Sequence, residues 1–342
     1  MTSKICLIKI LDELFKIYKL SELATILNLS NGTLTRWIKL QNVPNNYEFD
    51  LLKLLDKNID YTIYSSKQKD QFFTPKETAI QCYNIFCNEI QKYNDDIKDF
   101  IFIEPSAGDN SFTNILPQNT ISMDIEPLHK NIIKQDFLQW TPIKKNKYIV
   151  FGNPPFGLRG HMALQFINHS YNFAEYVCFI LPQLFESDGK GSPRKRVQGY
   201  NLIFSIKLQS NFYEPDKTEI KINTIFQIWS KNHVNLNYKI SDIKNDNIKI
   251  YSMSDGGNSS STRNIKMIGK CDIYVPSTCF GKENMKWYND FNDLPNKRGY
   301  GIVLKDKKKL KKKLKINLCD IAFLSTNSAY NLRSSQIMSL FN

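Results

Sequence analysis

The apolar run Tyr148-Ile-Val-Phe151 continues directly into Gly152-Asn-Pro-Pro-Phe-Gly157, and this stretch determines how the central part of the chain is interpreted. A short apolar run bounded by Gly and Pro is typical of a buried strand that ends in a turn. The Asn153 side-chain oxygen and the Pro154 carbonyl can each accept a hydrogen from an amino group. The two prolines fix φ and offer no backbone donor, and Phe156 can supply a face for an unstacked base. The stretch predicts a site that holds an exocyclic amine beside a planar ring; a plain strand-ending turn is the alternative.

Around this stretch, from about residue 61 to 235, apolar runs alternate with helical stretches, which is typical of a doubly wound α/β domain. The predicted strands are all short apolar runs, at 100–103, 120–123, 148–151, 176–181, 203–208 and 224–229. In such sheets a ligand binds beyond the carboxyl ends of the strands. The polar sequences that follow the strands are therefore the expected location of chemistry.

Two strand ends carry residues suited to a nucleoside-like ligand. After the first strand, residues 104–109 (Glu-Pro-Ser-Ala-Gly-Asp) predict a tight turn into a helix. The backbone at Gly108 can approach a ligand closely, and Glu104 can hold a cationic amino group. After the second strand, Asp124 is placed to accept hydrogen bonds from ribose hydroxyls, with Glu126 as the runner-up. A surface acid at a turn is the alternative for either carboxylate.

Two flanking segments extend this prediction. In residues 135–140 (Gln-Asp-Phe-Leu-Gln-Trp), Asp136 can accept from an adenine amino group while Phe137 or a neighbour packs on the ring. In residues 71–75 (Gln-Phe-Phe-Thr-Pro), the Thr-Pro pair is suited to start a helix. The aromatic rings and hydroxyl of this segment can close over a ligand, and a simple helix cap is the equal alternative.

Residues 1–60 predict a separate helical domain. Residues 20–30 followed by residues 31–38 have the shape of a helix-turn-helix, with small Ala24 where two helices would cross closely. The second helix is expected to present polar side chains that can reach phosphates or base edges: Asn31, Thr33, Thr35, Arg36 and Lys39. A helical bundle used for dimerisation is the alternative.

Residues 236–342 lose the strand–helix alternation and contain a lysine run, with eight lysines between Lys305 and Lys315. A second basic stretch includes Arg194, Lys195 and Arg196. Each is either a solvated face or a contact to a phosphate backbone.

Composition narrows the function classes. The 342 residues carry a formal net charge of +13, which favours a polyanionic partner, nucleic acid before a membrane. No apolar stretch approaches the length of a membrane helix, and the N-terminus lacks the organisation of a signal peptide, so a cytoplasmic location is expected. The seven cysteines are scattered without a Cys-x-x-Cys pair, and no metal site is expected.

Taken in chain order, these motifs resemble those of N6-adenine DNA methyltransferases. The matching stretches are Phe73-Thr-Pro, Glu104-Pro-Ser-Ala-Gly-Asp, Asp124, Asp136-Phe-Leu-Gln-Trp and Asn153-Pro-Pro-Phe. Their order is similar to that of the gamma group, and the resemblance covers about residues 70–230. It implies an α/β fold: a seven-stranded methyltransferase domain over 61–235. An all-α helix-turn-helix domain would precede it over 1–60, and an α+β target-recognition region would follow over 236–342.

The resemblance further implies S-adenosyl-L-methionine as the cofactor. The residues expected to contact it are Phe73, Thr74, Pro75, Glu104, Ser106, Ala107, Gly108, Asp124, Ile125, Asp136, Phe137 and Asn153. The catalytic residues would be Asn153, Pro154, Pro155 and Phe156, with the first two holding the target amine and Phe156 stacking on a flipped adenine. A second stacking aromatic is expected after the sixth strand, either Phe212 or Tyr213. One departure from the family is Asn110, which stands where a second glycine is common; Asn tolerates a left-handed conformation better than most residues.

The expected partner is duplex DNA, contacted by Thr33, Thr35, Arg36, Lys39, Arg194, Lys195 and Arg196. A restriction endonuclease and a second copy of the chain, joined through the N-terminal domain, are further partners compatible with the resemblance. Three rival functions remain open at this point: an RNA adenine methyltransferase, an enzyme that methylates a glutamine amide in release factors, and a DNA-binding regulator with a degenerate methyltransferase domain.

Overall fold

The computed structural model describes residues 6–27, 29, 31–55, 72–157, 160–187, 192–209, 211–238, 246–256, 262–305, 313–324 and 329–341. The expected boundary near residue 60 and most of the lysine run lie outside the described residues. Among the described helices, none combines the length and apolar character that crossing a bilayer requires.

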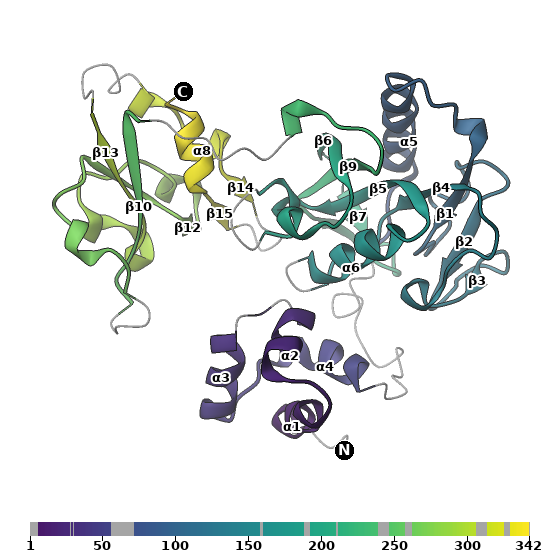
Figure 1. Ribbon diagram of the computed structural model, residues 1–342, viewed down its shortest axis with the longest axis horizontal. Coiled ribbons are helices and arrows are strands. Elements are labelled where there is room, and N and C mark those ends of the chain that lie inside the picture. Colours follow the sequence, from purple (N-terminus) through teal and green to yellow (C-terminus); the bar gives the residue numbers. More distant parts are fainter. Residues whose placement is uncertain are drawn as a thin grey trace.

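Four helices at the N-terminus pack around their own apolar core (Figure 1). They are α1 (Leu7–Ile17), α2 (Leu20–Ile26), α3 (Asn31–Leu40) and α4 (Glu48–Leu54). Helices α2 and α3 occupy the two segments predicted for a helix pair. Ala24 is buried in the core of this segment, and Trp37 meets Tyr47 edge-on at 4.5 Å between ring centroids. The helical nature of this segment is therefore confirmed, and contact with DNA remains a prediction.

The central segment forms a seven-stranded sheet with the order β3-β2-β1-β4-β5-β9-β6. Its strands are β1 (Phe100–Glu104), β2 (Ile121–Asp124), β3 (Ile133–Lys134), β4 (Lys147–Gly152), β5 (Ala174–Pro182), β6 (Asn201–Leu208) and β9 (Thr224–Ser230). Neighbouring strands are parallel, except that β9 runs antiparallel to both β5 and β6. All six predicted strands are present. Strand β3 was not predicted, because its two residues are exposed and carry no apolar alternation. This mostly parallel sheet is consistent with a methyltransferase fold.

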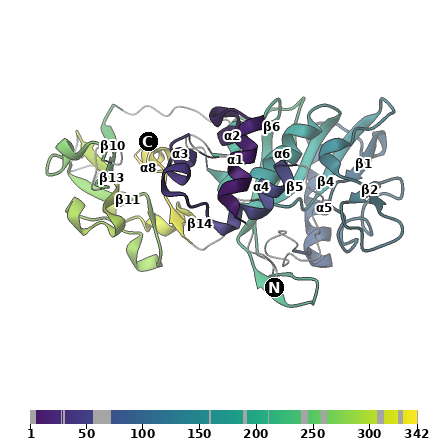
Figure 2. The ribbon, with the colours of Figure 1, turned by 90° about the horizontal axis from the view of Figure 1, so that it is seen from below.

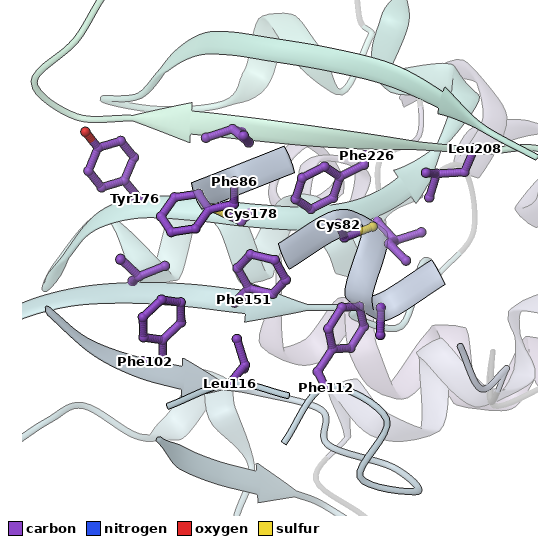
Figure 3. Close-up of a cluster of buried hydrophobic side chains, with 14 of the residues drawn as sticks. Cys82, Phe86, Phe102, Phe112, Leu116, Phe151, Tyr176, Cys178, Leu208 and Phe226 are labelled. Atoms are coloured by element: carbon purple, nitrogen blue, oxygen red, sulfur yellow. The ribbon is translucent and has the colours of Figure 1, made fainter. Parts of the chain in front are cut away.

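Two helices cover the sheet on opposite faces, α5 (Lys76–Gln91) and α6 (His161–Ser170), each over a separate apolar cluster. In the cluster under α5 the Phe151 ring lies among other aromatic rings (Figure 3). Its centroid is 5.6 Å from that of Phe112 and 5.7 Å from those of Phe86 and Phe226. Such tilted and edge-on contacts add to the free energy gained by burial. They fix β4, and hence the turn that follows it, against β1, β9 and α5.

A short hairpin not predicted from the sequence follows the sixth strand in the chain. Its strands are β7 (Asn211–Tyr213) and β8 (Glu219–Lys221), paired antiparallel. Tyr213 also pairs with Phe73, which brings the hairpin to the start of α5.

The C-terminal segment contains two small antiparallel sheets around apolar clusters of its own. One comprises β10 (Ile248–Ser254), β13 (Arg298–Leu304) and β11 (Ile273–Pro276); the other comprises β12 (Thr278–Cys279), β15 (Tyr330–Asn331) and β14 (Phe323–Leu324). Helix α8 (Ser334–Ser339) packs on β10 (Figures 1 and 2). Two hydrogen bonds tie this segment to the turn after β5: Leu324 N to Gln183 Oε1 at 2.9 Å, and Arg333 Nε to Ser187 Oγ at 3.1 Å.

Candidate functional site

Three segments that are far apart in sequence meet at the carboxyl end of β4. Asn153 follows β4, and its backbone carbonyl accepts a hydrogen bond from Ser106 Oγ at 3.0 Å, in the turn after β1. The Asn153 side-chain nitrogen donates to the Phe72 carbonyl at 3.1 Å, just ahead of α5. The structure thus brings together the Phe-Thr-Pro segment, the glycine turn and the Asn-Pro-Pro turn.

The side-chain oxygen of Asn153 is buried and has no hydrogen-bond partner. Because Nδ2 is held by a carbonyl, which can only accept, the network assigns Oδ1 as the free end of the amide. Leaving a buried acceptor unpaired costs about 1–3 kcal/mol. A ligand that donates a hydrogen here would remove that cost, which is the arrangement expected of an amine-binding residue.

Of the other residues in the Asn-Pro-Pro-Phe turn, Pro154 and Phe156 are buried and Pro155 is half-buried. The Phe156 carbonyl accepts from Met162 N at 3.1 Å and from Ala163 N at 3.3 Å, so the start of α6 fixes the end of the turn. The Phe156 ring, however, is only 7% exposed and belongs to the apolar cluster under α5. In this arrangement the Phe156 ring therefore packs within the protein, and its stacking on a base remains a prediction.

The glycine turn is held to the end of β2. Gly108 N donates to Asp124 Oδ2 at 2.9 Å, and Glu126 N donates to Asp124 Oδ1 at 2.8 Å. Gly108 has a φ of +51° and Asn110 a φ of +70°, so Asn110 adopts the left-handed conformation expected at its position. Asp124, the favoured candidate, thus lies against the turn.

Gly108 lies directly beneath the Phe73 ring, and a Cβ at this position would sit 2.9 Å from Phe73 Cε1. We expect Gly108→Ala to push this ring aside and to strain the backbone at its positive φ, at a cost of roughly 1–3 kcal/mol in the free energy of unfolding. Chemical denaturation would measure it. Gly269→Ala, at a φ of +75° with open space around it, is the control for backbone strain alone. Equal losses in both variants would contradict the close packing of Phe73.

Glu104 lies at the base of the same turn and is only 1% exposed. The Thr113 hydroxyl donates to its carboxylate. Burial, with a smaller contribution from the nearby Asp124 and Asp109 charges, raises the pKa of Glu104 to about 8. At neutral pH the free site therefore holds a largely protonated carboxyl group. A cationic group bound beside it would favour ionisation.

This raised pKa predicts a pH-dependent stability. The pKa of Glu104 is near its ordinary value of 4.5 in the unfolded chain and about 8 in the folded protein, so its stabilising contribution is complete below about pH 4.5 and is lost as pH rises towards 8. In Glu104→Gln that loss is absent. The free energy of unfolding of the variant, relative to the parent, should rise between pH 5 and 8 by about 1.4 kcal/mol per pH unit and then level off. If urea titrations showed that the free energy of unfolding depends on pH in the same way in the parent and in Glu104→Gln, the burial argument would be contradicted.

The turn after β3 carries two of the predicted contact residues, Asp136 and Phe137. Asp136 Oδ1 accepts from Leu138 N at 3.0 Å and thereby caps a short 3-10 helix over Phe137–Gln139. The Phe137 ring is 1% exposed, with its centroid 5.0 Å from that of Phe166 on α6. The Phe137 side chain therefore anchors the turn in the core, and packing of Phe137 or a neighbour on a ligand ring remains a prediction.

Three of the buried oxygen atoms without a hydrogen-bond partner belong to the segments that form this site. They are Thr74 Oγ1, Asn110 Oδ1 and Asn153 Oδ1. Buried polar groups are almost always hydrogen-bonded, so unpaired ones mark places where a ligand or water completes the structure. Together with the Glu104 and Asp124 carboxyl groups, they give a set of acceptors that fits a ligand bearing an amino group and hydroxyls. The described residues contain no cluster of side chains able to hold a metal ion.

The remaining residues predicted to contact the cofactor or the base differ in how far they are buried. Pro75 is the residue before the first turn of α5, as the Thr-Pro pair predicted. Ala107 is buried, and Ser106 and Ile125 are half-buried at the ends of their strands. Of the two aromatic candidates after β6, Phe212 is fully buried in the core, whereas Tyr213 is half-buried beside Phe73.

The residues predicted to contact DNA also divide into two groups. On α3, Thr35, Arg36 and Lys39 are exposed and Thr33 is half-buried; Lys195 is exposed as well. Arg194 instead donates to the carbonyls of Glu186 and Tyr238, so its guanidinium serves as an internal clamp. Arg196 is half-buried, and its Nη1 atom is buried without a partner.

Sequence reasoning missed two contributors to this site. Thr113 bonds to Glu104 from the turns after Gly108, and the Phe72 carbonyl holds Asn153. A threonine nine residues after a buried acid carries no recognisable signal, and a backbone carbonyl carries none at all.

No protein-family model matches this sequence, and no curated protein is similar to it. Several solved structures are similar in part, including the following two. One is a candidate RNA methyltransferase from Pyrococcus horikoshii, with 14% identity, a TM-score of 0.36 and alignment over 56% of this chain and 99% of that chain. The other is a modification subunit of a candidate type I restriction enzyme from Vibrio vulnificus, with 10% identity, a TM-score of 0.31 and alignment over 68% of this chain and 59% of that chain. The function proposed for this chain rests on the geometry of its own site.

Proposed function

We propose that this protein is an adenine-specific DNA methyltransferase that transfers a methyl group from S-adenosylmethionine to the N6 amine of a flipped adenine in duplex DNA. The observation that carries the proposal is the Asn153 amide. Its nitrogen is bonded to the Phe72 carbonyl, and its buried oxygen has no partner. An acceptor held in this way at the carboxyl end of a central strand suits an exocyclic amine.

The acceptors of the turn supply the chemistry expected from the protein. Asn153 Oδ1 and the Pro154 carbonyl would accept the two hydrogens of the amine and draw its nitrogen towards tetrahedral geometry, which frees the lone pair for attack. The nitrogen then loses one proton to solvent, so no general base of shifted pKa is needed. The contribution of the enzyme is alignment and preorganised acceptors.

The cofactor would be held by the turns that follow β1 and β2. When bound, S-adenosylmethionine supplies an electrophilic methyl group. The Glu104 carboxyl group suits its cationic amino group, and Asp124 suits the ribose hydroxyls. Thr74 Oγ1, buried without a partner, is available to a polar group of the same ligand.

Duplex DNA is the proposed substrate because positive charge is spread well beyond the methyl-transfer site. The net charge is +13, and exposed basic side chains on α3, such as Arg36 and Lys39, lie outside the α/β unit. Phosphate contacts of this kind supply much of the affinity for DNA and position the duplex. A modification enzyme of a restriction system would have such an organisation.

The test is transfer of a tritiated methyl group from S-adenosylmethionine to mixed-sequence duplex DNA and to RNA, each with the other as competitor. We expect tritium to be incorporated into DNA, and unlabelled RNA should not reduce the amount incorporated. Label in RNA alone would assign the enzyme to RNA methylation. Cofactor binding without label in either polymer would direct attention to a protein amide, and absence of cofactor binding would favour a regulator with a degenerate domain.

A further inference from the structure

The hairpin β7–β8 reaches the site through Tyr213. The backbone of Tyr213 pairs with that of Phe73 by two hydrogen bonds, Phe73 N to Tyr213 O at 2.8 Å and Tyr213 N to Phe73 O at 3.2 Å. The two rings also meet, with their centroids 5.7 Å apart. The hairpin therefore holds the segment that carries the Phe72 carbonyl.

The side chain of Tyr213 bonds to the glycine turn. Its hydroxyl donates to Asp109 Oδ2, and the other carboxylate oxygen of Asp109 accepts from Ser111 Oγ at 2.7 Å. Lys217 Nζ lies 4.4 Å from the centroid of the Tyr213 ring and 4.0 Å from Asp109 Oδ2. Burial, and next the hydrogen bond to Asp109, raises the pKa of Tyr213, so the hydroxyl stays protonated as a donor. One side chain thus joins the hairpin to the residue after Gly108.

This clamp acts on the amide of Asn153 through a single intervening residue. Phe72 directly precedes Phe73, and its carbonyl is the acceptor that holds Asn153 Nδ2. A side-chain amide can rotate by half a turn, which exchanges the positions of its oxygen and nitrogen. If the Phe72 carbonyl moves, Asn153 Nδ2 has no other hydrogen-bond acceptor in the described structure. The amide could then rotate, and its NH₂ group would face the target amine in place of Oδ1.

We propose that Tyr213 is a positioning residue for methyl transfer. Its hydroxyl, bonded to Asp109, fixes the hairpin that pairs with Phe73 and so holds the neighbouring Phe72 carbonyl in place. That carbonyl in turn keeps Asn153 Oδ1 turned towards the target amine. The proposal rests on the proposed function of Asn153. It gives Tyr213 a role other than stacking on the flipped base. It also explains why the hairpin is bonded to both the Phe-Thr-Pro segment and the glycine turn.

The kinetic test compares Tyr213→Phe, which keeps the ring and removes the hydroxyl, with Tyr148→Phe. Tyr148 is a buried tyrosine of β4 whose hydroxyl donates to the Lys144 carbonyl at 2.8 Å, away from the site. We expect kcat of Tyr213→Phe to fall about five- to tenfold, the effect of one lost charge-assisted hydrogen bond, with KM for DNA and Kd for the cofactor within twofold. Tyr148→Phe should leave kcat unchanged. Adding Asp109→Ala to Tyr213→Phe should lower kcat no further than Asp109→Ala alone.

A second measurement follows the amide without any enzymatic activity. In protein labelled with ¹⁵N at asparagine, the side-chain NH₂ resonances missing from Asn153→Ala identify Asn153. Tyr213→Phe should shift these resonances and speed their exchange with water, and Tyr148→Phe should not. Unchanged Asn153 resonances, or an equal fall of kcat in both tyrosine variants, would overturn the proposal. A shift in a protein that transfers no methyl group would support the clamp and refute the proposed function instead.

Discussion

Asn153→Ala is expected to lower kcat for methyl transfer by roughly 10²- to 10³-fold, the size of effect seen when one preorganised polar group is removed from an active site. The cofactor and DNA should still bind within a few-fold of the parent, because most of their proposed contacts lie elsewhere. Single-turnover rates and equilibrium binding would separate the two quantities. Asn232→Ala, an exposed asparagine bonded to Glu175, is the control.

This loss of activity should occur with little change in stability. The substitution removes the hydrogen bond from Asn153 Nδ2 to the Phe72 carbonyl, but it also removes a buried oxygen that has no partner. The two effects oppose one another, so the free energy of unfolding should change by about 1 kcal/mol or less. A large loss of stability, or full activity in the variant, would contradict the role assigned to this amide.

Phe151→Ala should have the largest effect on stability, a loss of about 3–5 kcal/mol in the free energy of unfolding. The Phe151 side chain is fully buried and contacts aromatic rings from the turn after β1, from α5 and from β9. The cavity left by the ring cannot be filled without moving the strand that positions Asn153. Urea denaturation followed by far-UV circular dichroism would measure the loss.

A matched control for this prediction is Phe280→Ala. The Phe280 side chain is 60% exposed, so its removal should change the free energy of unfolding by less than about 0.5 kcal/mol. If Phe151→Ala lost less than about 1 kcal/mol, the packing described around β4 would be wrong.

The sheet could be predicted from the sequence because its strands are short apolar runs with clear boundaries. The run before Asn153 becomes β4, a strand whose residues from Tyr148 onwards are all buried. Motif residues at strand ends could be placed for the same reason: parallel strands bring their carboxyl ends to one edge. The left-handed conformation of Asn110 also followed from its residue type.

The orientation of side chains could not be predicted in the same way. Phe137 and Phe156 belong to motifs that suggested ring stacking, yet both rings fill the core, because burial of a large apolar surface outweighs any local preference. Arg194 looked like a phosphate contact but bonds to two backbone carbonyls. The Tyr213 clamp depends on a contact between residues 104 positions apart, for which a single sequence gives no signal.

The most direct test of the central claim is to identify the atom that receives the methyl group. Duplex DNA methylated by the protein would be digested to nucleosides and analysed by mass spectrometry against synthetic standards. We predict N6-methyldeoxyadenosine, present with the parent protein and reduced at least 100-fold with Asn153→Ala. Methylation at any other atom, or N6-methyldeoxyadenosine formed equally well without the Asn153 side chain, would contradict the role of this turn as an amine-binding site.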